Sequence, residues 1–128
     1  MRNRFFILII LSCLVLYFSS CTNDKLVPVM NDCSGETPVW DGEVEEIVAL
    51  TCAYAGCHIS GSSAPGNYLS YNGINSILGN GKFKNRVFDI KDNPTLGMPP
   101  ANSPGPKELT EEQLSTLSCW MEAGFPVN

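Results

Sequence analysis

Apolar and polar positions divide the chain into an apolar start, a polar stretch and a series of short amphipathic segments. Residues 5–18 are almost all apolar, and residues 22–38 are polar with no regular period. Beyond residue 40, apolar positions recur three and four residues apart, as they do along the buried stripe of a helix. No segment alternates convincingly as a strand would. The pattern therefore predicts an all-α domain of three or four short helices around long loops.

The first helix is expected to begin at Asp41, whose carboxylate suits the N-cap position. Three glutamates follow in the first turns, where negative charge is favourable to the helix dipole: Glu43, Glu45 and Glu46. The positions expected to be buried repeat at helical spacing: Val44, Ile47, Val48 and Thr51. This helix leads directly into Cys52.

The middle of the chain contains many turn residues. Residues 59–67 are rich in Gly, Ser and Pro and are expected to form a loop. Ser70 suits the N-cap of a short helix that the Gly-Asn-Gly of residues 79–81 would end. Residues 82–90 are compatible with a helix or a strand, and we favour a short helix. Residues 92–106 hold so many prolines and glycines that we expect no regular structure there.

The last helix has the clearest boundaries. Thr110 and Gln113 have the spacing of a capping box, and Gly124 and Pro126 mark the end of the helix. Its apolar stripe is Leu114, Leu117 and Met121. Helices so few and short supply little apolar volume with which to close a core. We therefore expect the domain to need a disulfide, a metal or a large apolar cofactor.

The apolar start has the features of an export signal in residues 1–20, because two arginines precede the apolar run and small serines follow it. Cys21, directly after this run, resembles the lipobox cysteine of a bacterial lipoprotein. The resemblance implies that Cys21 becomes the acylated first residue, with residues 21–40 as a tether and residues 41–128 as the domain. An ordinary signal peptide or an uncleaved anchor helix is the alternative, although the apolar run is shorter than the ~20 residues of a membrane span.

A lipid anchor implies a place in the cell envelope, as a periplasm-facing or surface lipoprotein, and we expect the outer membrane. The formal net charge of −5 becomes −7 when Arg2 and Arg4 are removed with the signal. This acidic balance argues against nucleic acid or anionic lipid as the main partner. It would suit docking to a basic patch on a redox partner, although most acidic surfaces serve only solubility.

The chemistry of the chain is concentrated in the sequence CAYAGCH, residues 52–58. A Cys-His pair with another Cys shortly before it is the pattern that attaches a c-type haem, since the thiols add to the haem vinyl groups and the imidazole ligates the iron. The usual motif has two residues between the cysteines, and this chain has four. For Cys52 to reach its vinyl group, the extra residues must loop out, with Gly56 in an unusual backbone conformation. Attachment through Cys57 alone is the alternative.

His58 is the only histidine, so two histidine ligands from one chain are excluded. Met98 stands in a Met-Pro-Pro loop that proline stiffens, where a thioether can be held against iron at small entropic cost. The other methionines lie in the signal, in the tether and on the stripe of the last helix: Met1, Met30 and Met121. Met98 is therefore the expected second ligand, and a loop methionine packed for its bulk is the alternative.

Taken together, these features make residues 41–126 resemble a small class I cytochrome c domain of the kind found in bacterial envelope lipoproteins. The resemblance rests on the Cys-His pair after a helix, the Met-Pro-Pro loop forty residues beyond the histidine, and the capped last helix. It implies a cytochrome c-like fold around one covalent haem c. Cys52 and Cys57 would attach the haem, and His58 and Met98 would be its axial ligands.

The resemblance extends to the groups around these ligands. It implies that the backbone carbonyl of Pro65 accepts the imidazole N–H and fixes its orientation. Four side chains are candidates to bond the haem propionates: Tyr68, Tyr71, Arg86 and Trp120. The sequence supplies no general base, nucleophile pair or second haem motif, so we expect an electron carrier rather than an enzyme.

Cys33 and Cys119 remain once the haem motif has taken its pair. They can bridge the tether to the last helix, and two free thiols are the alternative, which export disfavours. Three other readings stay open. A zinc site would need Cys33 or Cys119 as an additional ligand. A non-redox binding or structural lipoprotein would be stapled by Cys33–Cys119 and Cys52–Cys57, and a haem-based sensor would use Met98 as a displaceable ligand.

Overall fold

The structure is a computed structural model that describes residues 33–128. The predicted signal in residues 1–20, the acylation site Cys21 and most of the tether lie outside the described residues. Within the described residues, four α-helices and two π-helical turns follow one another in the order η1, α2, α3, α4, η2, α5. No strand occurs between residues 33 and 128, so the prediction of an all-α fold is confirmed for this part of the chain.

The first helical segment is irregular where the sequence predicts its start. The π-turn η1 (Trp40–Val44) precedes α2 (Glu45–Thr51), and Asp41 and Gly42 depart from helical dihedral angles. Asp41 is therefore not an N-cap, and this prediction is wrong. Its amide donates to the carbonyl of Val127 at 2.8 Å, so the end of the chain supplies an acceptor at the start of the segment. The apolar stripe predicted for this helix is buried or half-buried, as expected.

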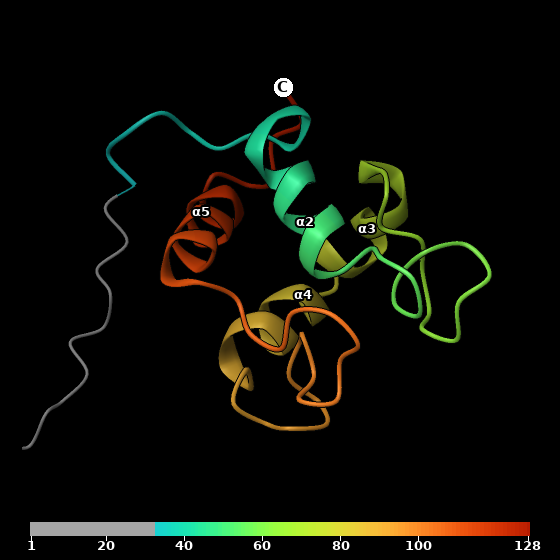
Figure 1. Cartoon of the computed structure of the whole chain (residues 1–128). Helices are drawn as coiled ribbons and strands as arrows, with labels where there is room; N and C mark the ends of the chain where they lie inside the picture. The colour runs from blue at the N-terminus through green and yellow to red at the C-terminus, as the bar shows by residue number, and fades with distance from the viewer. Residues whose placement is uncertain (1–32) are drawn as a thin grey trace, which may run out of the picture.

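The next helices form where the sequence predicts them. α3 (Tyr71–Leu78) is capped by Ser70, whose hydroxyl accepts a backbone N–H at 3.3 Å. α4 (Lys82–Lys84) continues into the π-turn η2 (Asn85–Asp89), and together they give the short helix favoured there. Two long connections, before α3 and after η2, extend from the helices and approach each other (Figure 1).

The last helix, α5 (Glu111–Glu122), has the predicted capping box. Thr110 Oγ1 accepts from the Gln113 amide at 3.1 Å, and Gln113 Oε1 accepts from the Thr110 amide at 3.0 Å. Leu117 on its stripe is buried and the other two stripe positions are half-buried. Within residues 33–128, no helix has the length and apolar character needed to cross a bilayer.

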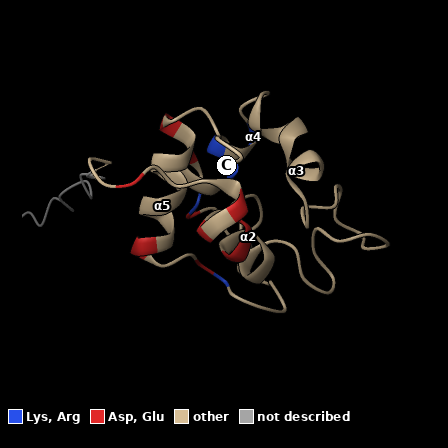
Figure 2. Cartoon of the chain, turned by 90° about the horizontal axis from the view of Figure 1, so that it is seen from above, with Lys and Arg blue, Asp and Glu red and all other residues tan. Residues whose placement is uncertain are grey.

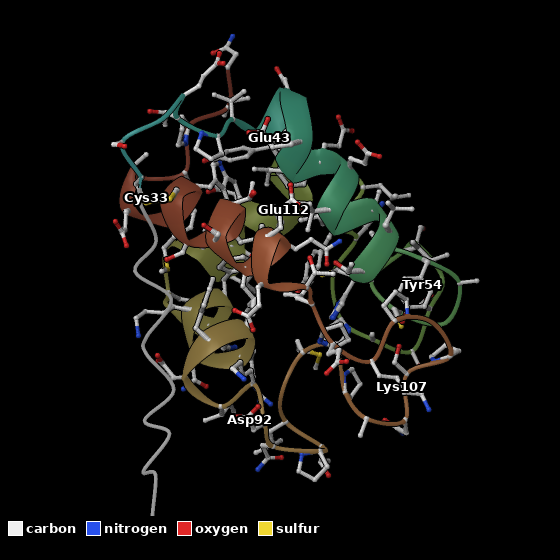
Figure 3. The ribbon with its side chains drawn as sticks, turned by 60° about the vertical axis from the view of Figure 1, so that its left-hand side comes forward. Cys33, Glu43, Tyr54, Asp92, Lys107 and Glu112 are labelled. Carbon is white, nitrogen blue, oxygen red and sulfur yellow. A yellow bond between two sulfur atoms is a disulfide. The ribbon has the colours of Figure 1, made fainter. Side chains whose placement is uncertain are left out.

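Aromatic rings form the centre of the core. The ring of Trp120 is fully buried, with its centroid 5.9 Å from that of Trp40 and 5.0 Å from that of Phe125. Trp40 is only 3% exposed, so the packed domain includes a residue that the sequence analysis assigned to the tether. A disulfide joins Cys33 to Cys119, with Cα atoms 5.4 Å apart, and ties the segment before Trp40 to α5 (Figure 3). Of the two alternatives for these cysteines, the structure therefore has the bridge.

Candidate functional site

A cavity of about 720 Å³ opens between the two long connections and the helices α3 and α4 with η2. Most of its wall is apolar and includes Ile74, Phe83 and Val87. All four residues that the sequence predicts for a haem site line it: Cys52, Cys57, His58 and Met98. The volume lies within the range of sites that enclose cofactors and other small molecules. The fold thus places the two halves of the predicted ligand pair at one cavity.

The widened motif forms a closed turn after α2. The His58 amide donates to the Cys52 carbonyl at 3.0 Å, and the Cys57 amide donates to the Tyr54 carbonyl at 2.9 Å. Gly56 has a φ of +89°, the unusual conformation expected of it. The four intervening residues therefore form a bulge whose two ends stay hydrogen-bonded. This geometry explains how the longer spacing still leaves both cysteines at the cavity.

The imidazole of His58 is held on two sides. Its Nδ1 lies 2.7 Å from the carbonyl oxygen of Pro65, the partner that the sequence analysis expected. Its ring stacks on Tyr68, with centroids 4.1 Å apart and planes 16° from parallel. A neutral imidazole that donates from Nδ1 keeps the lone pair of Nε2 for a ligand. His58 is thus oriented as a metal-ligating histidine requires.

The loop that carries Met98 has no regular structure, as predicted, yet its backbone is well anchored. The Met98 amide donates to the carbonyl of Arg86 at 3.0 Å, and the Arg86 guanidinium donates to the carbonyl of Leu96 at 2.9 Å. Gly97 lies so close to the preceding chain that a Cβ there would be 2.3 Å from a carbonyl oxygen. The peptide bond between Met98 and Pro99 is cis. The hydrogen bonds and the close approach of Gly97 fix the chain at Met98 and directly before it.

The charged side chains of the cavity wall are all basic. Lys82 and Arg86 line the cavity, and no described Asp or Glu does. Much of the ribbon coloured for Asp and Glu in Figure 2 belongs to α2 and α5, and the glutamates of these two helices are exposed. The cavity therefore suits a ligand that is apolar with anionic groups, although the chain as a whole is acidic.

Cys52 and Cys57 are not joined to each other. Burial raises the pKa of the Cys52 thiol, and an interaction with Thr51 Oγ1 at 3.4 Å lowers it in part. No cluster of three or more His, Cys, Asp or Glu side chains within the described residues has the arrangement of a metal site. Because Cys33 and Cys119 are bridged to each other, the zinc reading lacks its additional ligand.

Two of the four candidate propionate partners are engaged elsewhere. The Tyr71 hydroxyl donates to the Phe125 carbonyl at 3.0 Å, and Trp120 Nε1 donates to the Pro126 carbonyl at 2.9 Å. Neither side chain lines the cavity, because both hold the C-terminal segment against the core. The prediction is therefore wrong for Tyr71 and Trp120. The other two candidates, Tyr68 and Arg86, do line the cavity.

Two features of the site were not predicted from the sequence. Lys82 lines the cavity, and a lysine at a helix start carries no signal that would have identified it. The Tyr54 hydroxyl is hydrogen-bonded to Ser103 Oγ, which joins the bulge to the loop after Met98. The widened cysteine spacing was the available signal for this second feature.

Comparison of the chain with protein-family models, with curated proteins and with solved structures gives no match.

Proposed function

We propose that this protein is a monohaem c-type cytochrome that transfers single electrons in the cell envelope. The observation that carries the proposal is the convergence of Cys52, Cys57, His58 and Met98 on one apolar cavity. A Cys-His pair preceded by a second Cys attaches haem c, and a methionine thioether is the usual second axial ligand of such carriers.

The residues present fit haem in their chemistry as well as their number. The lone pair of His58 Nε2 is available because Nδ1 bonds the Pro65 carbonyl. Lys82 and Arg86 offer positive charge to the two propionates, and the apolar wall matches the macrocycle. When bound, haem supplies an iron that gains and loses one electron, and thioether ligation favours its reduced form relative to two imidazoles.

The same residues favour electron transfer over substrate chemistry. His58 and Met98 would both be ligands of the iron, which would leave no coordination position for a substrate. Arg86 also anchors the backbone of Met98, which argues for a ligand that stays in place rather than a displaceable one. Acylation at Cys21 would hold the domain at the membrane. The carboxylates on α2 and α5 would meet a redox partner of opposite charge.

The alternative hypothesis to be distinguished from a cytochrome is a non-redox lipoprotein with two disulfides. It needs a Cys52–Cys57 disulfide, and these two thiols are unpaired. Mass spectrometry of the full chain, exported by a host that attaches haem c, distinguishes the two. We expect a gain of one haem that survives acid-acetone extraction. A haem-free protein that has lost four hydrogens to two disulfides would overturn the proposal, and a Cys52→Ala/Cys57→Ala variant serves as the haem-free control.

A further inference from the structure

The extra residues of the haem motif make a contact that the usual spacing would not provide. Tyr54, within the bulge between the two cysteines, reaches the loop that follows Met98 and hydrogen-bonds to Ser103 Oγ. Ser103 is 6% exposed, so its hydroxyl depends on protein partners rather than on water. In Figure 3, Tyr54 lies where the segment after α2 meets the loop that leads to Lys107.

Packing supports the hydrogen bond on the same loop. The Tyr54 ring lies so close to Gly105 that a Cβ on that glycine would be 2.6 Å from the ring. The bulge also approaches the loop at Gly56, where a Cβ would be 3.7 Å from Pro104. The Tyr54 ring therefore packs directly against the Gly105 backbone. A side chain at position 105 would displace the ring.

The contact continues through the backbone toward Met98. Ser103 Oγ accepts from the Gly105 amide at 3.3 Å, and the Ser103 amide donates to the Pro100 carbonyl at 2.9 Å. Pro100 is two residues from Met98, whose own amide is held from the other side by the Arg86 carbonyl. Arg86 thus anchors the start of the Met-Pro-Pro segment, and Tyr54 holds Ser103, whose amide bonds the end of that segment.

We propose that Tyr54 is a positioning residue that holds the Met98 loop at the cavity and so keeps Met98 on the iron. This inference rests on the proposed function, since it assigns a role toward the haem ligand. The extra length of the widened motif then has a purpose, because it carries Tyr54. The Tyr54–Ser103 contact, called the clamp below, joins the segment that would hold one face of the haem to the loop that would hold the other. Removal of this contact would release Ser103 and Gly105 from the bulge, while Arg86 still anchors the Met98 backbone and the Ala101 amide still donates to the Pro94 carbonyl at 3.1 Å.

The test compares Tyr54→Phe with Tyr71→Phe in the haem-loaded full chain. Both variants lose one hydroxyl and one hydrogen bond, but that of Tyr71 is made to the C-terminal segment, away from the cavity. Cyanide binds the ferric iron only after Met98 has left, so its binding rate reports how often the loop opens. We expect about a fivefold faster rate for Tyr54→Phe, the factor that one ordinary hydrogen bond is worth, and no change for Tyr71→Phe. Equal rates in Tyr54→Phe and the wild type would overturn the inference.

A double-mutant cycle and a haem-independent readout complete the test. If the two hydroxyls act through one bond, Ser103→Ala should raise the rate as Tyr54→Phe does, and the double variant should add little to either. Hydrogen exchange at the Ser103 and Gly105 amides should also be about fivefold faster in Tyr54→Phe. A chain without covalent haem would defeat the proposed function, while the exchange data would still show whether Tyr54 orders the loop. Unchanged exchange would defeat the clamp whether or not haem is bound.

Discussion

The Nδ1 atom of His58 lies 2.7 Å from the carbonyl oxygen of Pro65, seven residues further along the chain. The intervening Gly- and Ser-rich loop therefore returns to the histidine and gives its ring a fixed acceptor. Because Nδ1 is the donor in this bond, Nε2 is the nitrogen that the proposed haem iron would take. Tyr68 covers the face of the ring, so the imidazole is oriented by both hydrogen bonding and stacking.

A His58→Phe variant separates stacking from ligation. Phenylalanine can still stack on Tyr68 but has no nitrogen for iron, so the low-spin His/Met absorption spectrum should be lost. A Tyr68→Phe variant keeps the aromatic face and should retain that spectrum. Absorption spectra of the two exported proteins check the prediction. A His58→Phe protein with an unchanged spectrum would show that another group is the ligand.

Met98→Ala should remove the thioether–iron charge-transfer band and lower the reduction potential, because methionine ligation favours the reduced iron. The reduced variant should also bind carbon monoxide, which the wild type should not. Met121→Ala is the matched control, since Met121 lies half-buried on α5 and does not line the cavity. Absorption spectroscopy and a redox titration supply the readouts. Ready binding of carbon monoxide by the wild type would instead favour a sensor with a displaceable methionine.

The disulfide between Cys33 and Cys119 joins residues 86 positions apart and so encloses most of the domain. Its loss should lower the free energy of unfolding by about 2–5 kcal/mol, because the unfolded chain gains freedom. A Cys33→Ser/Cys119→Ser variant compared with the wild type by urea denaturation checks this value. A thiol reductant should destabilise the wild type and leave the variant unaffected, since thioethers to haem are not reduced. Equal stability of the two proteins without reductant would contradict the prediction.

Alkaline pH should lower the free energy of unfolding through the ionisation of Tyr54. Burial is the largest effect on Tyr54 and raises the pKa of its phenol above the ordinary value. The folded state therefore holds a proton that the unfolded state releases above about pH 10, so stability is unaffected below that pH and falls as the pH rises through the higher, folded-state pKa. Urea midpoints measured from about pH 8 to about pH 11 should fall less steeply in Tyr54→Phe than in the wild type. Identical slopes would show that Tyr54 does not contribute to the loss.

Local signals along the sequence predict most of the helices. The Thr110 and Gln113 capping box and the Ser70 cap occur as predicted, because both depend on residues within a few positions of each other. Asp41 fails as a cap because the C-terminal segment bonds that part of the chain instead. Trp40 was assigned to the tether for a similar reason, since its partners Tyr71 and Trp120 are far away in sequence.

In the candidate site, too, local motifs were predictable and contacts between distant residues were not. The Cys-His pair and the Met-Pro-Pro loop were evident because ligand chemistry restricts which residues can hold a haem iron. The Tyr54–Ser103 pair was not, because it joins two loops that carry no periodicity and meet only in the folded chain. The roles of Tyr71 and Trp120 were missed because a side-chain donor does not reveal which distant carbonyl it will find.

The central claim is that one haem is covalently attached at the cavity lined by Cys52, Cys57, His58 and Met98. A pyridine haemochrome spectrum of the exported full-length protein tests it most directly, because the band position counts the vinyl groups converted to thioethers. The bulge keeps Cys52 at the cavity, so we predict one haem per chain with two thioethers. A spectrum with no haem, or with haem whose two vinyl groups are both intact, would contradict the claim.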